Sequence, residues 1–246
     1  MDNIYLDNAA STPISPEVIE VMLKSMQSNK GNPSSIHSTG RIAKAKLEMA
    51  RKNIASTINA LPSEIIFTSG GTEADNLAIQ TATCGLKVKR IITAKTEHHA
   101  VLNTIDFLKK NKNIEIDYLE LNNDGSIDLN HLIKLLSSNS VKTLVSLMHV
   151  NNETGTLLNI DKVAKICREN NAFFHSDTTQ SLGYYDLDVK ELGIDFLVCS
   201  AHKFHGPKGI GFLYIKQGLS IQPLMFGGNQ ERGIRPGTEN IHSILG

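Results

Sequence analysis

The feature that most constrains the fold of this chain is a regular alternation of short apolar, β-branched runs with longer segments of helical periodicity. Short apolar runs are typical of buried strands, and strands that alternate with helices indicate an α/β domain with a mostly parallel sheet. The sequence predicts seven strands: Glu64–Ser69, Arg90–Ala94, Ile114–Leu121, Lys142–Val150, Ala172–Asp177, Asp195–Ala201 and Gly211–Lys216.

The segments between these runs carry helix signals. Ser15 precedes Pro16 and Glu17, and a capping serine before a proline in the first turn predicts a helix start. Good helix formers with apolar residues at helical spacing predict further helices over 39–58, 72–83 and 161–170. The last two strands are joined by a short Gly-Pro turn, which is too short for a parallel crossover, so we expect that pair to be antiparallel.

Charge and cysteine usage exclude several classes of protein. The 246 residues include 25 basic and 25 acidic side chains, so no global charge draws the chain to nucleic acid or to an anionic membrane. The N-terminal stretch MDNIYLDNAASTP lacks the basic start and apolar core of a secretory signal, and we expect a cytoplasmic protein. Cys84, Cys167 and Cys199 are too far apart for a disulfide framework or a metal pair, and we expect each to be a buried small hydrophobe.

A glycine-rich stretch follows the first predicted strand. Gly70, Gly71 and Thr72 lead directly into a predicted helix. Two glycines let the backbone approach an anion, and a helix N-terminus offers N–H groups and the positive end of its dipole. The stretch lacks the lysine of a P-loop and the spacing of a dinucleotide fingerprint, so it predicts either a phosphate cradle or a plain strand–helix turn.

Polar side chains follow four of the later strands: His98, Asn152, Asp177 and Lys203. Because ligands of open α/β sheets bind at the carboxyl ends of the strands, we expect these side chains to share one site. A lysine in a desolvated pocket is a good imine-forming nucleophile. Pyridoxal phosphate needs such a lysine, a carboxylate for its ring nitrogen, a phosphate cradle and a flat group against its ring. The alternative, a nicotinamide dinucleotide, would leave Lys203 and Asp177 without a role.

The chain resembles the cysteine desulfurases, which are fold-type I pyridoxal-phosphate enzymes of the class V aminotransferase type. The resemblance rests on eight stretches that follow one another over nearly the whole chain: YLDNAASTP, GNPSSIHSTGR, FTSGGTEADNLAI, KTEHHAVLN, HVNNETGTLLNI, HSDTTQSLG, SAHKFHGPKGIGFLYI and ERGIRPGTEN. It implies the large domain of that α/β fold, with a mostly parallel seven-stranded sheet, one antiparallel strand and helices on both faces.

The resemblance also implies roles for individual residues. Lys203 would carry pyridoxal 5'-phosphate as a covalent imine and move protons at the substrate, and Asp177 would pair with the protonated ring nitrogen. His98 would stack on the ring and act on the substrate as an acid or base. The remaining cofactor-binding residues would be Gln180 at the ring hydroxyl, Asn152 close to the ring, and Gly71, Thr72, Ser200 and His202 at the phosphate. Thr238 would reach the phosphate of a partner subunit, which implies a homodimer.

By the same resemblance, the protein would convert L-cysteine to L-alanine and hold the sulfur as a persulfide on an enzyme cysteine. The sulfur would then pass to an iron–sulfur scaffold or another acceptor protein. The family's persulfide cysteine and the arginine that grips the substrate carboxylate lie beyond the RPGTEN motif, and none of the three cysteines here takes that position.

We therefore expect a C-terminally truncated chain that lacks the small domain. Residues 1–15 would be an N-terminal segment that packs with that domain, and residues 16–246 would be a cofactor-binding large domain, incomplete at its C-terminus. Two other functions stay open. A selenocysteine lyase or cysteine-sulfinate desulfinase would need no cysteine nucleophile, and a catalytically silent protein would bind the cofactor and dimerise without a reaction.

Overall fold

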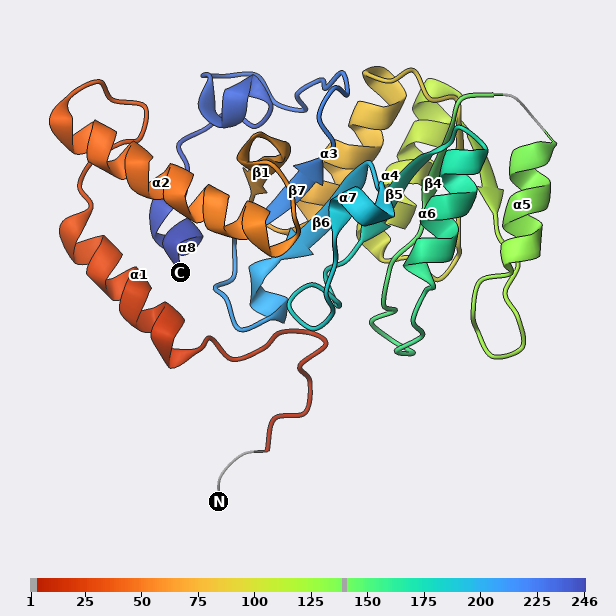
Figure 1. Cartoon of the computed structure of the whole chain (residues 1–246), viewed down its shortest axis with the longest axis horizontal. Helices are drawn as coiled ribbons and strands as arrows, with labels where there is room; N and C mark the ends of the chain where they lie inside the picture. The colour runs from red at the N-terminus through yellow and green to blue at the C-terminus, as the bar shows by residue number, and fades with distance from the viewer. Residues whose placement is uncertain (1–3, 139–140) are drawn as a thin grey trace.

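The computed structural model describes residues 4–138 and 141–246, and within them strands alternate with helices as the sequence predicts (Figure 1). The strands are β1 (Ile65–Thr68), β2 (Arg90–Thr93), β3 (Glu115–Tyr118), β4 (Thr143–Ser146), β5 (Phe173–Asp177), β6 (Phe196–Ser200) and β7 (Gly211–Ile215). The α-helices are α1 (Pro16–Ser28), α2 (Ser38–Thr57), α3 (Gly71–Cys84), α4 (His99–Lys112), α5 (Leu129–Ser137), α6 (Ile160–Glu169), α7 (Val189–Leu192) and α8 (Ile241–Leu245). Short 3₁₀ turns are η1 (Pro62–Glu64), η2 (Ala201–Lys203) and η3 (Gln230–Gly233).

The seven strands form one sheet in the order β1-β7-β6-β5-β4-β2-β3. The pairs β2–β3, β2–β4, β4–β5 and β5–β6 are parallel. Strand β7 is antiparallel to both of its neighbours, β1 and β6. The predicted mostly parallel sheet with one antiparallel strand is therefore confirmed, including the antiparallel last pair.

The strand β4 is shorter than its apolar run predicts. The run over 142–150 forms a strand only as far as Ser146. Beyond it the Leu147 and His149 amides still donate to carbonyls of β5, at 3.1 and 3.0 Å, while the Met148 amide between them donates to Glu97 Oε1 at 2.8 Å. The sequence analysis does not predict the short helix α5. It buries Leu132 and Leu136, and Asp128 caps its first turn.

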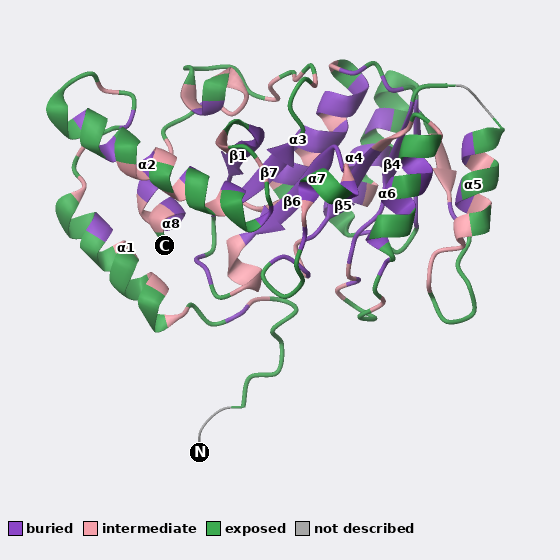
Figure 2. Ribbon diagram, viewed as in Figure 1, coloured by how far each residue is buried: buried purple, intermediate pink, exposed green. Residues whose placement is uncertain are grey.

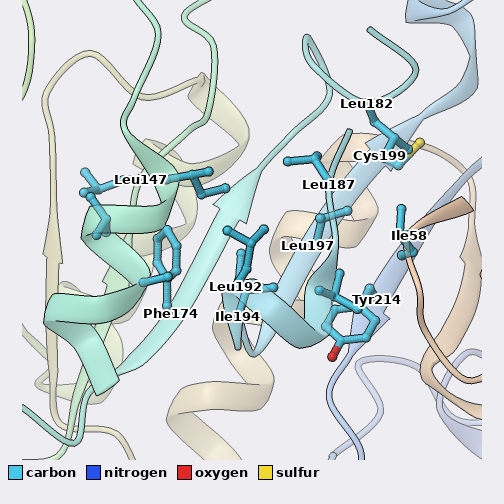
Figure 3. Packing of buried hydrophobic residues seen from close by; sticks show 14 of the residues in the cluster. Ile58, Leu147, Phe174, Leu182, Leu187, Leu192, Ile194, Leu197, Cys199 and Tyr214 are labelled. Atoms are coloured by element: carbon cyan, nitrogen blue, oxygen red, sulfur yellow. The ribbon is translucent and has the colours of Figure 1, made fainter. Parts of the chain in front are cut away.

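Helices cover both faces of the sheet, and side chains alternate between the two cores. On one face α2, α5, α6 and α7 pack over residues such as Phe174 and Leu197. On the other face α3 and α4 pack over residues such as Phe196 and Val198. Figure 2 shows the strands other than the edge strand β3 almost entirely buried, and Figure 3 shows the first of these cores from close by.

The cysteine predictions are correct for two of the three residues. Cys167 and Cys199 are buried, but Cys84 is exposed, because it is the last residue of α3 and lies just before the turn at Gly85. Cys199 packs into the core beneath α2 and α7 (Figure 3). Among the described residues, no helix has the length and apolar character needed to span a bilayer.

A buried ion pair fixes the C-terminal loop to the sheet. Arg51 of α2 donates to both carboxylate oxygens of Glu231 at 2.6 and 2.7 Å, and the two side chains are 2% and 1% exposed. Glu231 also accepts from the Phe67 amide at 2.8 Å, and Arg51 donates to the Ile65 carbonyl at 2.8 Å. These bonds satisfy both charges and hold Glu231 in a left-handed backbone conformation with φ of 45°.

We expect Glu231→Leu to destabilise the fold by about 3–5 kcal/mol, because it leaves the buried Arg51 guanidinium with only the more exposed Glu48 carboxylate as a counter-charge. The measurement is urea unfolding followed by circular dichroism. The double variant Arg51→Met, Glu231→Leu should recover most of that loss, since it removes both buried charges together. Equal destabilisation of the single and double variants would contradict this account.

Candidate active site

The carboxyl ends of β4, β5 and β6 and the N-termini of α3 and α4 surround a cavity of about 470 Å³. Nine of the ten predicted site residues line it: Gly71, Thr72, His98, Asn152, Asp177, Gln180, Ser200, His202 and Lys203. The structure thus places together residues that are up to 132 positions apart in the sequence (203 − 71 = 132). A larger, mostly apolar cavity of about 620 Å³ lies elsewhere and contains none of these nine residues.

Thr238 is the predicted site residue that the cavity does not include. It is exposed in the loop before α8, and its neighbour Gly237 adopts a φ of 107°. The prediction placed Thr238 in the site of a partner subunit, so its position outside this chain's own cavity neither supports nor contradicts that role.

Lys203 ends the 3₁₀ turn η2, which follows directly from β6. Its Nζ donates to the backbone carbonyls of Ala9 and Ala10, the second at 3.0 Å. Burial lowers the pKa of Lys203, and the charges of Asp177 and Asp7 oppose that change. A lysine with a lowered pKa offers more of its unprotonated amine, which is the form that attacks a carbonyl.

The N-terminal segment around Ala9 and Ala10 forms a wall of the cavity that the sequence analysis did not predict. Thr12 donates to the His202 carbonyl through its amide at 2.8 Å and through its hydroxyl at 3.0 Å, and its hydroxyl accepts from the His205 amide at 2.7 Å. Gln180 Nε2 donates to the Ala9 carbonyl at 2.8 Å. Figure 1 shows this segment passing the end of β6 before it enters α1. The stretch LDNAASTP carried no chemical signal of its own, because its contribution is made through backbone carbonyls.

Asp177 is the last residue of β5 and is 6% exposed. The Thr179 amide donates to its Oδ1 at 2.9 Å, which orients the carboxylate toward the cavity. Burying a carboxylate without hydrogen-bond donors is costly, and this amide offsets part of that cost. A cationic ring nitrogen in the cavity would supply a second, charged partner.

The turn between β1 and α3 has the form of an anion cradle. Gly70 has a φ of 149°, which side chains rarely allow, and a Cβ on Gly71 would lie 3.1 Å from Thr179 Oγ1. Thr179 Oγ1 is buried without a hydrogen-bond partner among the described residues, and the buried Ser200 lies beside it. The turn thus presents the start of a fourteen-residue helix and polar groups to the cavity, and these suit a phosphate.

His98 caps α4, and its Nδ1 accepts from the Ala100 amide at 3.1 Å. In that arrangement the ring carries its proton on Nε2 when neutral, and Nε2 is the atom left for the cavity. Asn152 is half-buried beside it, with Nδ2 donating to Glu153 Oε1 at 2.6 Å. Burial lowers the pKa of His202, as do the charges of Lys203 and Lys208.

Sequence reasoning missed two buried acids next to these residues. Asp75 lines the cavity from the buried face of α3, and Glu97 lies just before α4. Burial raises the pKa of Glu97 to about 8, and the nearby charge of Asp177 acts in the same direction. The available signal was an aspartate on an otherwise apolar helix face, between Ala74 and Leu77.

The chain matches known proteins over nearly its whole length. The family model described as Aminotransferase class-V matches residues 4–246. A cysteine desulfurase IscS of Dictyoglomus turgidum is 48% identical over 99% of this chain, and a putative cysteine desulfurase IscS 1 of Bacillus subtilis is 44% identical over all of it. The chain spans 61% and 65% of the lengths of these two relatives.

Solved structures show the same similarity. A NifS-like protein superposes with a TM-score of 0.95 at 38% identity, over 99% of this chain and 67% of the other. A structure described as SspA in complex with cysteine superposes with a TM-score of 0.91 at 37% identity, over 99% and 70%. The predicted fold-type I large domain and the resemblance to the cysteine desulfurases are confirmed, and the chain belongs to the aminotransferase class-V family.

Proposed function

We propose that this chain is the cofactor-binding part of a pyridoxal-phosphate-dependent cysteine desulfurase, which converts L-cysteine to L-alanine and transfers the sulfur to an enzyme cysteine. The observation that carries the proposal is that Lys203, Asp177 and the glycine cradle face one cavity. The family implies the cofactor, and the donor set fits it: an amine, a buried carboxylate, an imidazole and an anion cradle.

Each group of the cavity has a physical task in this proposal. Lys203 would hold the cofactor covalently through Nζ, Asp177 would stabilise the proton on its ring nitrogen, and the cradle with Ser200 and His202 would hold its phosphate. When bound, pyridoxal phosphate supplies an electron sink for the carbanion formed at the substrate α-carbon. His98 would lie against the ring and hold or move a proton at Nε2. Lys203 must leave the carbonyls of Ala9 and Ala10 to act as a base.

None of the three cysteines is in a position to accept the sulfur. Burial raises the thiol pKa of both Cys167 and Cys199, so neither forms the reactive thiolate. Cys84 is exposed, but it ends the fourteen-residue helix whose first turn forms the cradle, and such a helix is about 20 Å long. We therefore propose that the described residues bind cofactor and substrate but do not themselves complete sulfur transfer.

The lack of a suitable sulfur-accepting cysteine among the described residues favours a second candidate function. Selenocysteine lyases and cysteine-sulfinate desulfinases release a leaving group that needs no cysteine nucleophile, so a described cavity without a cysteine is compatible with them. A catalytically silent cofactor-binding protein is the remaining alternative. Alanine formation from cysteine, selenocysteine and cysteine sulfinate separates the three functions.

The other parts of the proposal follow from the family resemblance. They are a homodimer in which Thr238 reaches the partner's phosphate, an iron–sulfur scaffold or similar protein as sulfur acceptor, and a cytoplasmic location. They also include the division of the chain into an N-terminal segment, 1–15, and a large domain, 16–246. Residues 9–15 contact the turn around Lys203.

We expect Lys203→Ala to abolish covalent attachment of pyridoxal phosphate, because no other lysine lines the described cavity. Borohydride reduction followed by mass spectrometry of peptides measures the attachment. Lys208→Ala is the matched control, since Lys208 is exposed five residues away and should leave the labelling unchanged. Labelling that persists in Lys203→Ala would contradict the assignment.

We expect Asp177→Asn to weaken pyridoxal phosphate binding by about tenfold or more, because a hydrogen bond between two charged groups is lost. The cofactor titration is followed by absorbance. Asp186→Asn, at an exposed acid outside the cavity, should bind as the unaltered chain does. Equal affinities for Asp177→Asn and the unaltered chain would rule out the proposed pairing.

We expect the 246-residue chain to release little sulfide from cysteine, because no cysteine lines the described cavity. Sulfide and alanine are measured together, with Lys203→Ala as the blank. Many turnovers of sulfide release by this polypeptide alone would contradict the prediction. Either one of its own three cysteines would then accept the sulfur, or the reaction would need no cysteine.

A further inference from the structure

Asp75 is a buried acid with no partner of its own. It is 1% exposed on the inner face of α3, and neither carboxylate oxygen has a hydrogen-bond partner among the described residues. A carboxylate removed from water without donors is costly, and such a group keeps its proton instead. Asp75 nevertheless lines the cofactor cavity, so its protonation state bears on the site.

The nearest basic group to Asp75 does not supply a counter-charge. His175 Nε2 lies 3.3 Å from Asp75 Oδ1, and the two groups are not aligned as a hydrogen bond. On its other side, His175 Nδ1 shares a 2.9 Å hydrogen bond with Ser146 Oγ. Burial lowers the pKa of His175 to about 3, so the imidazole is neutral at neutral pH. His175 thus lies beside Asp75 without adding a positive charge.

Asp75 also lies close to two residues of the proposed mechanism. One ligand atom each of Asp75, His98 and Asp177 lie within 4.8 Å of one another. Burial raises the pKa of Asp75 well above its usual range, and the charges of Asp177 and Glu97 add to that effect. Two carboxyl groups so close together in a buried site do not both ionise, so one of them retains its proton.

The surroundings decide which of the two acids is neutral. Asp177 accepts a hydrogen bond from the Thr179 amide, whereas Asp75 receives none from the described residues. Resting on the proposed function, we propose that Asp75 is a positioning residue: a protonated carboxylic acid beside Asp177 that adds no negative charge to the cavity and leaves Asp177 as the acid that faces the ring nitrogen.

The role follows from what a neutral acid can do beside a carboxylate. Its O–H is a donor close to Asp177, and its lack of charge leaves the cavity with one fewer negative group. An asparagine at this position keeps a donor and the shape, whereas a leucine keeps only the bulk. The other titratable groups around Asp75 are Glu97, His98, His175, Asp177 and Lys203.

The first test needs no cofactor and measures the unfolding temperature against pH. The pKa of Asp75 is raised in the folded chain well above its ordinary value of 3.8. As pH rises above that value, the unfolded chain releases a proton that the folded chain retains. Asp75 therefore destabilises the fold increasingly with pH, and the ratio of folded to unfolded chain falls by up to about tenfold for each pH unit. Asp75→Asn should therefore be more stable than the unaltered chain at about pH 8, with the gain shrinking toward about pH 5.

The infrared spectrum gives a second readout of the same proton. The unaltered chain should show the C=O band of a protonated carboxylic acid that Asp75→Asn lacks. Glu97→Gln is the matched control: it removes another buried acid, one outside the cavity lining, and should leave the Asp75 band in place. A destabilised Asp75→Asn at pH 8, or no loss of an acid band, would show that Asp75 is ionised.

The third test measures pyridoxal phosphate affinity. We expect Asp75→Asn and Glu97→Gln to bind within about threefold of the unaltered chain, and Asp75→Leu to bind about tenfold more weakly, since a donor to a charged group is lost. Unchanged affinity in Asp75→Leu would overturn the positioning role. If the unaltered chain does not bind the cofactor, the proposed function fails instead, and the pH and infrared results still decide whether Asp75 is protonated.

Discussion

The parallel pairing of β5 with β6 is the constraint on which the candidate site depends. His175, Ser176 and Asp177 pair with Phe196, Leu197 and Val198, so both strands end at the same edge of the sheet. The carboxylate of Asp177 ends one strand, and the turn that carries Lys203 begins where the other ends. Backbone hydrogen bonds inside a buried sheet fix this register, and a slip of one residue would turn either side chain to the opposite face.

The alternation of side chains along β6 keeps Cys199 in the apolar core and away from the cofactor cavity. Cys199 lies four residues before Lys203, yet it packs among apolar residues under α2 and α7, on the face away from the cofactor cavity. Burial raises the pKa of its thiol, which makes the group inert as a nucleophile. Closeness in sequence to a catalytic lysine is therefore no indication of function when a strand intervenes.

Several acidic side chains lie close together at the cavity, and the surrounding structure controls their charge. Asp75, Glu97 and Asp177 are all buried around it, and His175 beside them is neutral. Hydrogen bonds decide how each acid responds: Asp177 accepts from one amide, Glu97 accepts from another, and Asp75 has no donor among the described residues.

The sequence by itself determined the order of strands and helices and the antiparallel last strand, because apolar periodicity and turn chemistry are local. Six of the nine predicted cavity residues followed from their positions after strands, and the family resemblance added Gln180, Ser200 and His202. The sequence did not identify Asp75, Glu97 or the carbonyls of Ala9 and Ala10 as part of the site. From the sequence alone an acid on a helix is expected to be exposed to solvent, and only the packing of α3 against the sheet buries Asp75. A backbone carbonyl has no side-chain signal in the sequence. Only the tertiary structure decided which of the acids has a hydrogen-bond donor and which segment lies against Lys203, because both depend on contacts between residues far apart in the chain.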